Sequence, residues 1–289
     1  MLRAIRVLAP NPSVYTLEGT NTWIVGGGPT IVLDPGPDDP AHRDEVLASA
    51  GEVAVVLVTH SHEDHGAGAA ALADRAHAPL FAWRLEGATH LTDGQRFLVP
   101  GADLEAVHTP GHSADHVVFL ERANGALFTG DAVLGRGTSF IDPPDGDLTA
   151  YLASLRHMQE LAPRTIYPGH GPVVVDAGAK LQDYIAHRAE REAQVLAGLE
   201  AGDRTVAQLV ERIYADYPVE VHALAARSVT AHLRKLDREG RVDKAGRGSS
   251  QTWTATAPNA CARCGRPVHG RGRYCGPCSL ALLQGEATS

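Results

Sequence analysis

The sequence predicts an α/β protein with a large main body and two smaller C-terminal parts. Residues 53–59 form a short apolar, β-branched run, which is typical of a strand buried on both faces. This run leads through a histidine cluster into an alanine-rich helix at residues 69–77, which Pro79 ends. Further β-rich pieces alternate with helices such as residues 148–161. In open α/β sheets of this kind, ligands bind at the carboxyl ends of the strands.

Composition limits the class of protein. With 289 residues, 44% hydrophobic and 21% charged, the chain can bury a sizeable core. No apolar run approaches the roughly 18 residues of a membrane span, and the first seven residues lack the pattern of a signal peptide. We therefore expect a cytoplasmic protein without a membrane segment. All four cysteines lie between residues 261 and 278, which excludes a disulfide scaffold for the main body.

The stretch "LVTHSHEDHGAG", residues 57–68, places three histidines and two acids in six consecutive positions. Alternate side chains of an extended segment point the same way, so His60 and His62 can converge on one point. Asp64 and His65, after the chain turns, can address a second point. Imidazole and carboxylate groups suit Zn²⁺ and related metals. A merely solvated polar loop is the alternative, but it gives no packing reason for this spacing.

Three more potential ligands follow other predicted strands. His112 comes after the strand at residues 104–109. Asp131 ends a hairpin in which residues 117–120 and 126–129 flank an Asn-Gly turn. His170 follows residues 165–167. The sequence thus predicts that these three side chains lie with the first four at the carboxyl ends of the strands.

The segments "THSHEDHGAG", "HTPGHSADH", "FTGD" and "YPGHGP", in this order, resemble the metallo-β-lactamase superfamily. The resemblance covers residues 1 to about 198 and implies an αβ/βα sandwich domain over residues 1–198. It also implies two metal ions, and every ligand position of such a dinuclear site is present. One metal is held by His60, His62 and His112, the other by Asp64, His65 and His170, and Asp131 bridges both.

The chemistry expected of two zinc ions in such a site is hydrolysis. A bridging water loses its proton near neutral pH and becomes the hydroxide nucleophile, and the metals polarise the substrate oxygen. Asp64 and Asp131 are the expected catalytic residues, because they position this nucleophile. The complete ligand set favours hydrolases over the iron-containing oxidoreductase branch, and it disfavours a non-catalytic binding module.

Three further residues are candidate outer partners of the ligands. Asp34, which ends the strand at residues 30–33, is a candidate partner for a ligating imidazole, although Asp-Pro-Gly is also good turn chemistry. His116 resembles a frequent family position near the site, and a hydrogen-bonded structural histidine is the alternative. Arg136 is expected to offset negative charge near the metals.

Finer motifs narrow the subgroup. The segments "APNPSVYTLEGTNTWIVG", "GDAVLGRGTSFI" and "IYPGHGPVV" resemble the β-lactamase-like protein 2 group. That resemblance implies either a zinc endoribonuclease acting on single-stranded RNA or a thioester hydrolase of the polyketide-releasing type. Glyoxalase II is the neighbouring family, but its substrate-binding C-terminal helices have no clear counterpart here.

The sequence pattern predicts a winged-helix-like domain over residues 199–257. Helical periodicity covers residues 205–214 and 223–239, and two short strands around a Gly/Ser-rich tip follow. Residues 203–257 hold nine basic and seven acidic residues, a net charge of +2. This weak charge favours a packing or substrate-lid role over the reading of a DNA sequence.

The cysteine spacing predicts a zinc ribbon over residues 258–289. Two Cys-x-x-Cys knuckles, each followed by glycine, suit one structural tetrahedral Zn²⁺. Reducible disulfides in a cytoplasmic protein are the poorer alternative. Four arginines in this module are compatible with docking to nucleic acid or to a protein. The expected ligands are Cys261, Cys264, Cys275 and Cys278.

Charge leaves two substrate classes open. Residues 1–202 hold 13 basic and 26 acidic residues, a net charge of −13, whereas residues 203–289 hold 13 and 8, a net charge of +5. The basic tail favours an endoribonuclease on single-stranded RNA. The acidic body favours the alternative, a hydrolase of small esters or thioesters. The sequence therefore predicts a dinuclear-zinc hydrolase with one of these two substrates.

Overall fold

The computed structural model describes residues 2–256, 259–260, 264 and 267–268. The chain divides into two compact units, one ending at His187 and the other beginning at Arg188. The potential metal ligands of the histidine motifs all lie in the first unit.

The first sheet of that unit has six strands in the order β1-β2-β3-β4-β5-β6. Strands β1, β2 and β3 pair antiparallel, and β3 to β6 pair parallel. The parallel part places the carboxyl ends of β3 and β4 side by side, so the loops that leave them meet. The bounds are β1 Ala4–Leu8, β2 Asn21–Val25, β3 Thr30–Leu33, β4 Val53–Leu57, β5 Leu80–Ala82 and β6 Thr89–His90.

The second sheet has five strands in the order β11-β10-β9-β8-β7. All neighbours pair antiparallel except β10 and β11, which are parallel. The hairpin predicted around the Asn-Gly turn joins β9 to β10, and Gly125 has the positive φ of 66° that the turn requires. The bounds are β7 Arg96–Val99, β8 Ala102–His108, β9 Val117–Glu121, β10 Ala126–Gly130 and β11 Thr165–Pro168.

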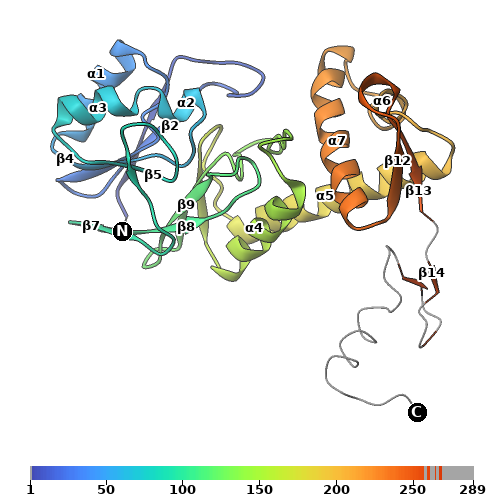
Figure 1. Cartoon of the computed structure of the whole chain (residues 1–289). Coiled ribbons are helices and arrows are strands. Elements are labelled where there is room, and N and C mark those ends of the chain that lie inside the picture. Colours follow the sequence, from blue (N-terminus) through green and yellow to red (C-terminus); the bar gives the residue numbers. More distant parts are fainter. Residues whose placement is uncertain (1, 257–258, 261–263, 265–266, 269–289) are drawn as a thin grey trace. The chain divides into compact units, whose positions relative to one another are not determined.

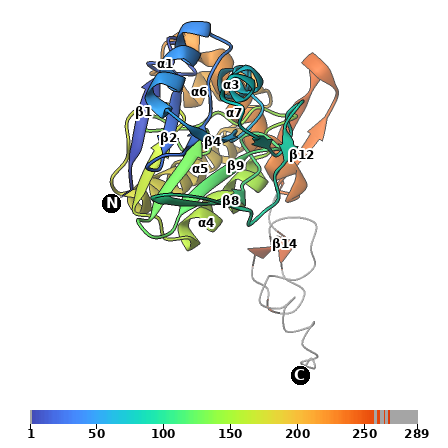
Figure 2. The same cartoon turned by 90° about the vertical axis from the view of Figure 1, so that its left-hand side faces the viewer.

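The main core lies between the two sheets. Trp23, Ile31 and Leu57 of the first sheet share one buried cluster with Phe119 and Phe128 of the second. A second cluster fills the space between the first sheet and two helices, α1 (Pro40–Ala50) and α3 (Ala69–Ala76). These helices lie on one side of the sheets, and α4 (Leu148–Glu160) lies on the other (Figures 1 and 2). The predicted αβ/βα sandwich is therefore confirmed.

Local sequence explains where α4 begins and which face it buries. The carboxylate of Asp147 caps the helix by accepting hydrogen bonds from the N–H groups of Thr149 and Ala150. Apolar side chains three and four positions apart form its buried face, namely Leu148, Tyr151, Leu152, Leu155 and Met158. Tyr151 lies against Gly111, where a Cβ atom would come within 2.3 Å of its backbone. The helix thus packs directly under the loop that carries His112.

The second unit contains a winged helix, as predicted. Helix α5 (Ala177–Glu200) continues into it, and α6 (Val206–Ile213), α7 (His222–Arg238) and the hairpin of β12 (Val242–Ala245) and β13 (Thr252–Ala255) follow. Short 3₁₀ turns occupy Val219–Val221 and Gly248–Ser250. One core cluster joins these elements; it contains Val195, Leu209, Val229, Leu236 and Trp253.

The chain beyond the winged helix is described only in part. Strands β14 (Asn259–Ala260) and β15 (Pro267–Val268) pair antiparallel. Three of the four cysteines of the predicted zinc ribbon, Cys261, Cys275 and Cys278, lie outside the described residues. The ribbon and the predicted domain boundaries at residues 198 and 257 therefore stay predictions.

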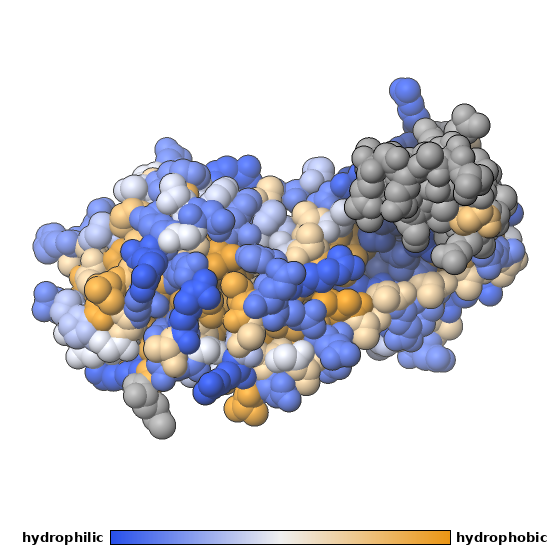
Figure 3. All heavy atoms as spheres, turned by 90° about the horizontal axis from the view of Figure 1, so that it is seen from below, coloured by the Kyte–Doolittle hydropathy of each residue, from blue (hydrophilic) through white to orange (hydrophobic). Residues whose placement is uncertain are grey.

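The surface in Figure 3 carries hydrophobic patches between hydrophilic side chains. Among the described residues, no helix is long and apolar enough to cross a membrane.

Candidate metal centre

Loops at the carboxyl ends of four strands carry the seven predicted ligands. The loop after β4 and the short helix α2 (Glu63–Gly66) supply four of them. The loop after β8 supplies His112, Asp131 directly follows β10, and His170 follows β11. Both sheets therefore contribute, and the structure brings the seven side chains together as three overlapping ligand groups.

The first group contains His60, His62 and His112. The Nε2 atom of His60 lies 2.9 Å from Nδ1 of His62, and Nδ1 of His62 lies 3.2 Å from Nε2 of His112. His60 is buried, whereas His62 is exposed. Three imidazole nitrogens thus converge at the border between the protein interior and solvent. We call this group the first triad.

The second group contains Asp64, His65 and His170. The Oδ2 atom of Asp64 lies 3.2 Å from Nε2 of His170 and 3.5 Å from Nε2 of His65. The two Nε2 atoms are 3.2 Å apart. Both histidines are buried, and the Asp64 side chain is 29% exposed. We call this group the second triad.

Asp131 lies between the two triads. Its Oδ2 atom is 3.7 Å from Nε2 of His112, in the first triad. Its Oδ1 atom is 3.4 Å from Nε2 of His65 and 3.2 Å from Nε2 of His170, in the second. Oδ1 is buried, and neither contact has the geometry of a hydrogen bond. A buried carboxylate oxygen without a hydrogen bond fits a position beside a cation.

The outer nitrogens of the histidines explain why their inner nitrogens can face one another. Nδ1 of His65 donates to Asp34 at 2.9 Å, Nδ1 of His112 donates to the Phe140 carbonyl at 2.8 Å, and Nδ1 of His170 donates to the Gly19 carbonyl at 3.1 Å. Each donor on the outside leaves a lone pair on the inner Nε2 atom. This is the tautomer in which histidine binds a metal.

Asp34 connects ligands of both triads. Its Oδ1 atom accepts from the Thr59 N–H at 2.7 Å, and its Oδ2 atom accepts from the Thr59 hydroxyl at 2.9 Å as well as from His65. The Thr59 hydroxyl in turn lies 3.0 Å from Nδ1 of His60. Asp34 is buried, so these bonds are shielded from water. One carboxylate thus orients His65 directly and His60 through Thr59.

The electrostatics of the second triad favour positive charge. Burial acts to lower the pKa of His65, but neighbouring carboxylates, Asp34 foremost, raise it well above its ordinary value. Burial opposes the rise for His170 as well, yet Asp131 and Asp64 raise the pKa of His170 to about 9. In a metal-free protein these carboxylates attract protons, and the same field attracts a divalent cation.

The first triad differs because fewer carboxylates face it. Burial lowers the pKa of His112, and it lowers the pKa of His60 well below the ordinary value, assisted by the neighbouring histidines. Neutral imidazoles are the form that binds a metal. The first triad offers three imidazole nitrogens and the second offers two with a carboxylate oxygen, and both donor sets fit first-row metals such as zinc or iron.

His116 and Arg136 lie apart from the three ligand groups. His116 is buried; its Nδ1 atom is 3.1 Å from the Thr109 hydroxyl, and its ring centroid is 5.1 Å from that of His60. Arg136 forms an ion pair with Glu18 at 2.6 Å, and its side chain is 62% exposed. The His116 ring thus lies next to the ring of His60 but belongs to none of the ligand groups. Arg136 pairs with a carboxylate that is not one of the seven ligands.

Three buried residues near the ligands lie within the quoted motifs, but the sequence assigns no role to them. Thr59 links Asp34 to His60, Asp115 accepts the Ser61 N–H at 3.0 Å, and Asn21 binds the turn that carries His170. Asn21 lies 147 and 150 positions from the carbonyls that it binds. Contacts of this kind arise only from the folded topology, so no local signal in a single sequence identifies them.

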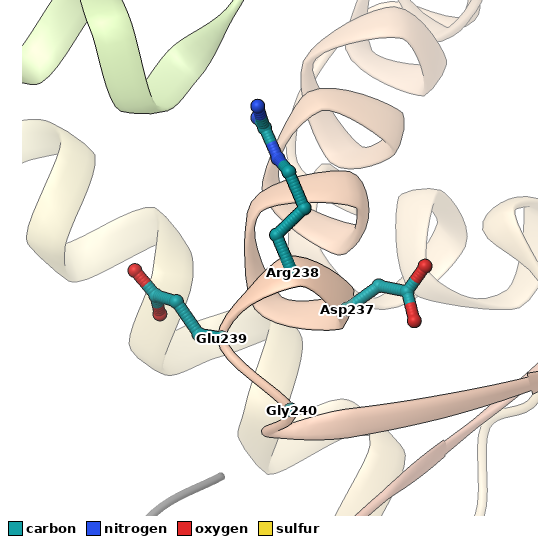
Figure 4. Close-up of a pocket in the computed structure, with 4 residues that line it drawn as sticks. All are labelled: Asp237, Arg238, Glu239 and Gly240. Atoms are coloured by element: carbon teal, nitrogen blue, oxygen red, sulfur yellow. The ribbon is translucent and has the colours of Figure 1, made fainter. Parts of the chain in front are cut away.

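A separate hollow lies at the end of α7. Asp237, Arg238, Glu239 and Gly240 line it, and the three charged side chains point away from one another (Figure 4). None of the seven ligands lines this hollow. Within the described part of the chain, the ligand groups at the strand ends are therefore the stronger candidate site.

Comparisons with known proteins show the family of both parts of the chain. Residues 15–170 match the Metallo-beta-lactamase superfamily, and residues 205–253 match the Beta-lactamase associated winged helix domain. The Drosophila melanogaster protein named Beta-lactamase-like protein 2 homolog is 35% identical over 82% of this chain and 89% of its own length. The Aspergillus fumigatus protein named Atrochrysone carboxyl ACP thioesterase is 35% identical over 88% of this chain and 87% of its own length.

A solved structure extends the comparison to the fold. A metallo-beta-lactamase family protein from Thermus thermophilus matches with a TM-score of 0.72 and 23% identity, over 88% of this chain and 98% of its own. Members of the superfamily contain a dinuclear metal site, which holds zinc or iron. Sequence, fold and ligand positions thus lead to one conclusion: this chain belongs to the metallo-β-lactamase superfamily of hydrolases.

Proposed function

We propose that the protein is a hydrolase that uses two zinc ions, one in each triad. The observation that carries this proposal is the position of Asp131, whose two carboxylate oxygens face different triads. A carboxylate in this position would contact both ions of a dinuclear site, in addition to their terminal ligands. The Asp131 side chain is 15% exposed, so most of it is shielded from water.

When bound, two divalent cations acidify a water molecule and polarise the oxygen of the bond to be cleaved. The protein itself supplies orientation. Asp64, the carboxylate of the second triad, is 29% exposed, so it could hold a metal ion and also orient the attacking water. Asp34 and the Phe140 carbonyl fix the rings of His65 and His112. No further side-chain base is required.

A small ester or thioester is the substrate class with the better support. The Aspergillus fumigatus relative is named as a thioesterase, and the similarity spans both the catalytic unit and the winged helix. The net charge of −13 over residues 1–202 repels polyanions. A neutral acyl thioester experiences no such repulsion.

Single-stranded RNA is the second candidate, and the charge of the C-terminal part favours it. Residues 203–289 carry a net charge of +5. The predicted ribbon contributes four arginines and one glutamate to this charge. A basic tail attached to an acidic catalytic unit can hold a phosphate backbone near the metals. Endonuclease activity on unstructured RNA is the reaction that this arrangement would serve.

A substrate comparison tests both classes. The purified full chain is incubated with acyl thioesters and with unstructured RNA, and Asp131→Ala serves as the control for contaminating activities. Thioester cleavage that disappears in the variant supports the first class, and RNA cleavage that disappears supports the second. Activity that survives in Asp131→Ala on both substrates contradicts the proposed site.

Metal analysis tests the zinc assignment. Seven ligands in the triads and four cysteines in the predicted ribbon lead us to expect up to three zinc ions per chain, two of them in the hydrolase site. One ion or none after expression with added zinc would contradict the dinuclear proposal. Two iron ions per chain would redirect it towards redox chemistry.

A further inference from the structure

Asn21, the first residue of β2, binds three carbonyl groups of the turn that carries His170. Its backbone N–H donates to the Gly169 carbonyl at 2.7 Å. Its side-chain amide donates to the Pro168 carbonyl at 3.0 Å and to the Gly171 carbonyl at 2.9 Å. The asparagine is fully buried, so water does not compete for these bonds. Both sides of His170 are therefore held by one residue.

An amide is the chemical group that these contacts need. Two carbonyl oxygens face the same side-chain atom, so this atom must carry two hydrogens, and the Nδ2 group of Asn21 does. The Pro168 carbonyl has a second donor, the indole N–H of Trp23 at 3.0 Å. For the Gly171 carbonyl, the amide of Asn21 is the donor that the structure shows. Removing the amide would leave this buried acceptor without its bond, which is unfavourable because water cannot replace the lost donor.

The position of this turn decides whether the second triad is complete. His170 comes from the second sheet, whereas Asp64 and His65 follow β4 of the first sheet. Asn21 belongs to the first sheet, and the preceding Thr20 forms an isolated bridge with His170. The bonds of Asn21 therefore fix the ligand from one sheet relative to the ligands from the other.

We infer that Asn21 is a positioning residue that sets the affinity of the second triad for its metal ion. Its hydrogen bonds go to backbone carbonyls of the Pro168–Gly171 turn, and it acts through that turn. The inference rests on the proposed dinuclear site and assigns a part of that site to a residue outside the histidine motifs. The first triad, in which no ligand comes from this turn, should be unaffected.

The test is a metal titration of the full-length protein and its Asn21→Leu variant. Leucine has nearly the shape of asparagine but donates no hydrogen bond. After metal removal, Co²⁺ is added stepwise and binding is followed by absorbance, in competition with a chelator of known affinity. We expect one ion of the hydrolase site, that of the second triad, to lose about 10-fold or more in affinity. Binding of the other ions should stay within the error of the parent values.

A matched control separates positioning from general loss of stability. Thr30, at the end of β3 opposite to the metal ligands, is also buried, and the one hydrogen of its hydroxyl is shared between the carbonyls of Ala50 and Glu52. Thr30→Val removes these bonds without changing the size of the side chain. It should lower the melting temperature as Asn21→Leu does, but should leave all metal affinities unchanged. Asn21→Ala, which leaves room for a water molecule, is the second variant if Asn21→Leu does not fold.

The outcomes are distinguishable. If the parent protein binds no ion at the triads, the proposed function is wrong. If the parent binds two ions there and the Asn21 variants bind both with parental affinity, the positioning role is wrong. If Thr30→Val weakens the same ion equally, the effect is one of stability, and the inference is overturned.

Discussion

The carboxylate of Asp131 faces both triads, with Oδ2 towards the first and Oδ1 towards the second. In the proposed dinuclear site, Asp131→Ala removes one ligand from each metal ion. We therefore expect turnover to fall by several orders of magnitude while the fold is kept, since no apolar core contact is lost. Initial rates measure the effect with whichever substrate, thioester or RNA, the parent protein cleaves. Circular dichroism checks the fold. Equal activity of variant and parent would mean that the site is misplaced.

Asp34 allows a second prediction for a single residue. Asp34→Asn keeps the shape of the side chain but places an amide against the donors of Thr59 and His65. Because outer partners orient metal-binding imidazoles, we expect metal affinity to fall by about 10- to 100-fold. Equilibrium dialysis against a metal buffer measures this change.

Asp38→Asn is the matched control for Asp34→Asn. Asp38 lies in the same loop, its side chain is 65% exposed, and it pairs with Arg43 rather than with a ligand. Its substitution should leave the affinity at the parent value. A similar loss in both variants would attribute the effect to net charge rather than to orientation.

At the scale of elements, the turn between β11 and α5 constrains the site most tightly. A Cβ atom at Gly169 would lie 2.6 Å from Cε1 of His65 and 2.9 Å from Oδ1 of Asp131. Gly169→Ala should therefore push ligands apart and lower both metal occupancy and kcat. Gly178→Ala in α5 is the same substitution with its nearest atom at 3.7 Å, and it should raise stability by about 0.5–1 kcal/mol. Full activity of Gly169→Ala would show that the turn can relax.

The sequence predicts the elements well where local signals are strong. The hairpin at Asn124-Gly125 and the start of α4 follow from turn and capping chemistry, which acts within a few residues. The ligands are predictable because their spacing is short within each motif. Asn21, Thr59 and Asp115 are not, because their partners lie on other strands or their role depends on the direction of a buried side chain. Local pattern thus predicts the ligands, and only the fold shows what holds them.

At the scale of the whole molecule, the charge difference between the two parts of the chain leads to a prediction about substrate. Deleting residues 258–289 removes four arginines and one glutamate, a change of −3 in net charge. If RNA is the substrate, its affinity should fall and the salt dependence of binding should flatten, because fewer counterions are released. Cleavage of a small thioester should be nearly unchanged, since the seven ligands all precede residue 171.

Parallel measurements across a salt series compare the full chain with this truncated form. RNA cleavage that is insensitive to both salt and truncation would contradict the ribonuclease candidate. Thioester cleavage that is lost on truncation would contradict the view that residues 1–202 contain the whole hydrolytic site.

Each triad takes ligands from both sheets, so a bound ion joins the two halves of the sandwich. The unfolded chain does not present these ligands together, and by mass action each ion present at 100 times its dissociation constant should add about 2.7 kcal/mol to the free energy of unfolding. A plot of melting temperature against free metal concentration should therefore rise steadily and reveal the two affinities without any substrate. In a metal-poor cell the same linkage would shorten the lifetime of the protein, because the open form is what proteases degrade. Metal supply would then set the amount of this protein as well as its activity.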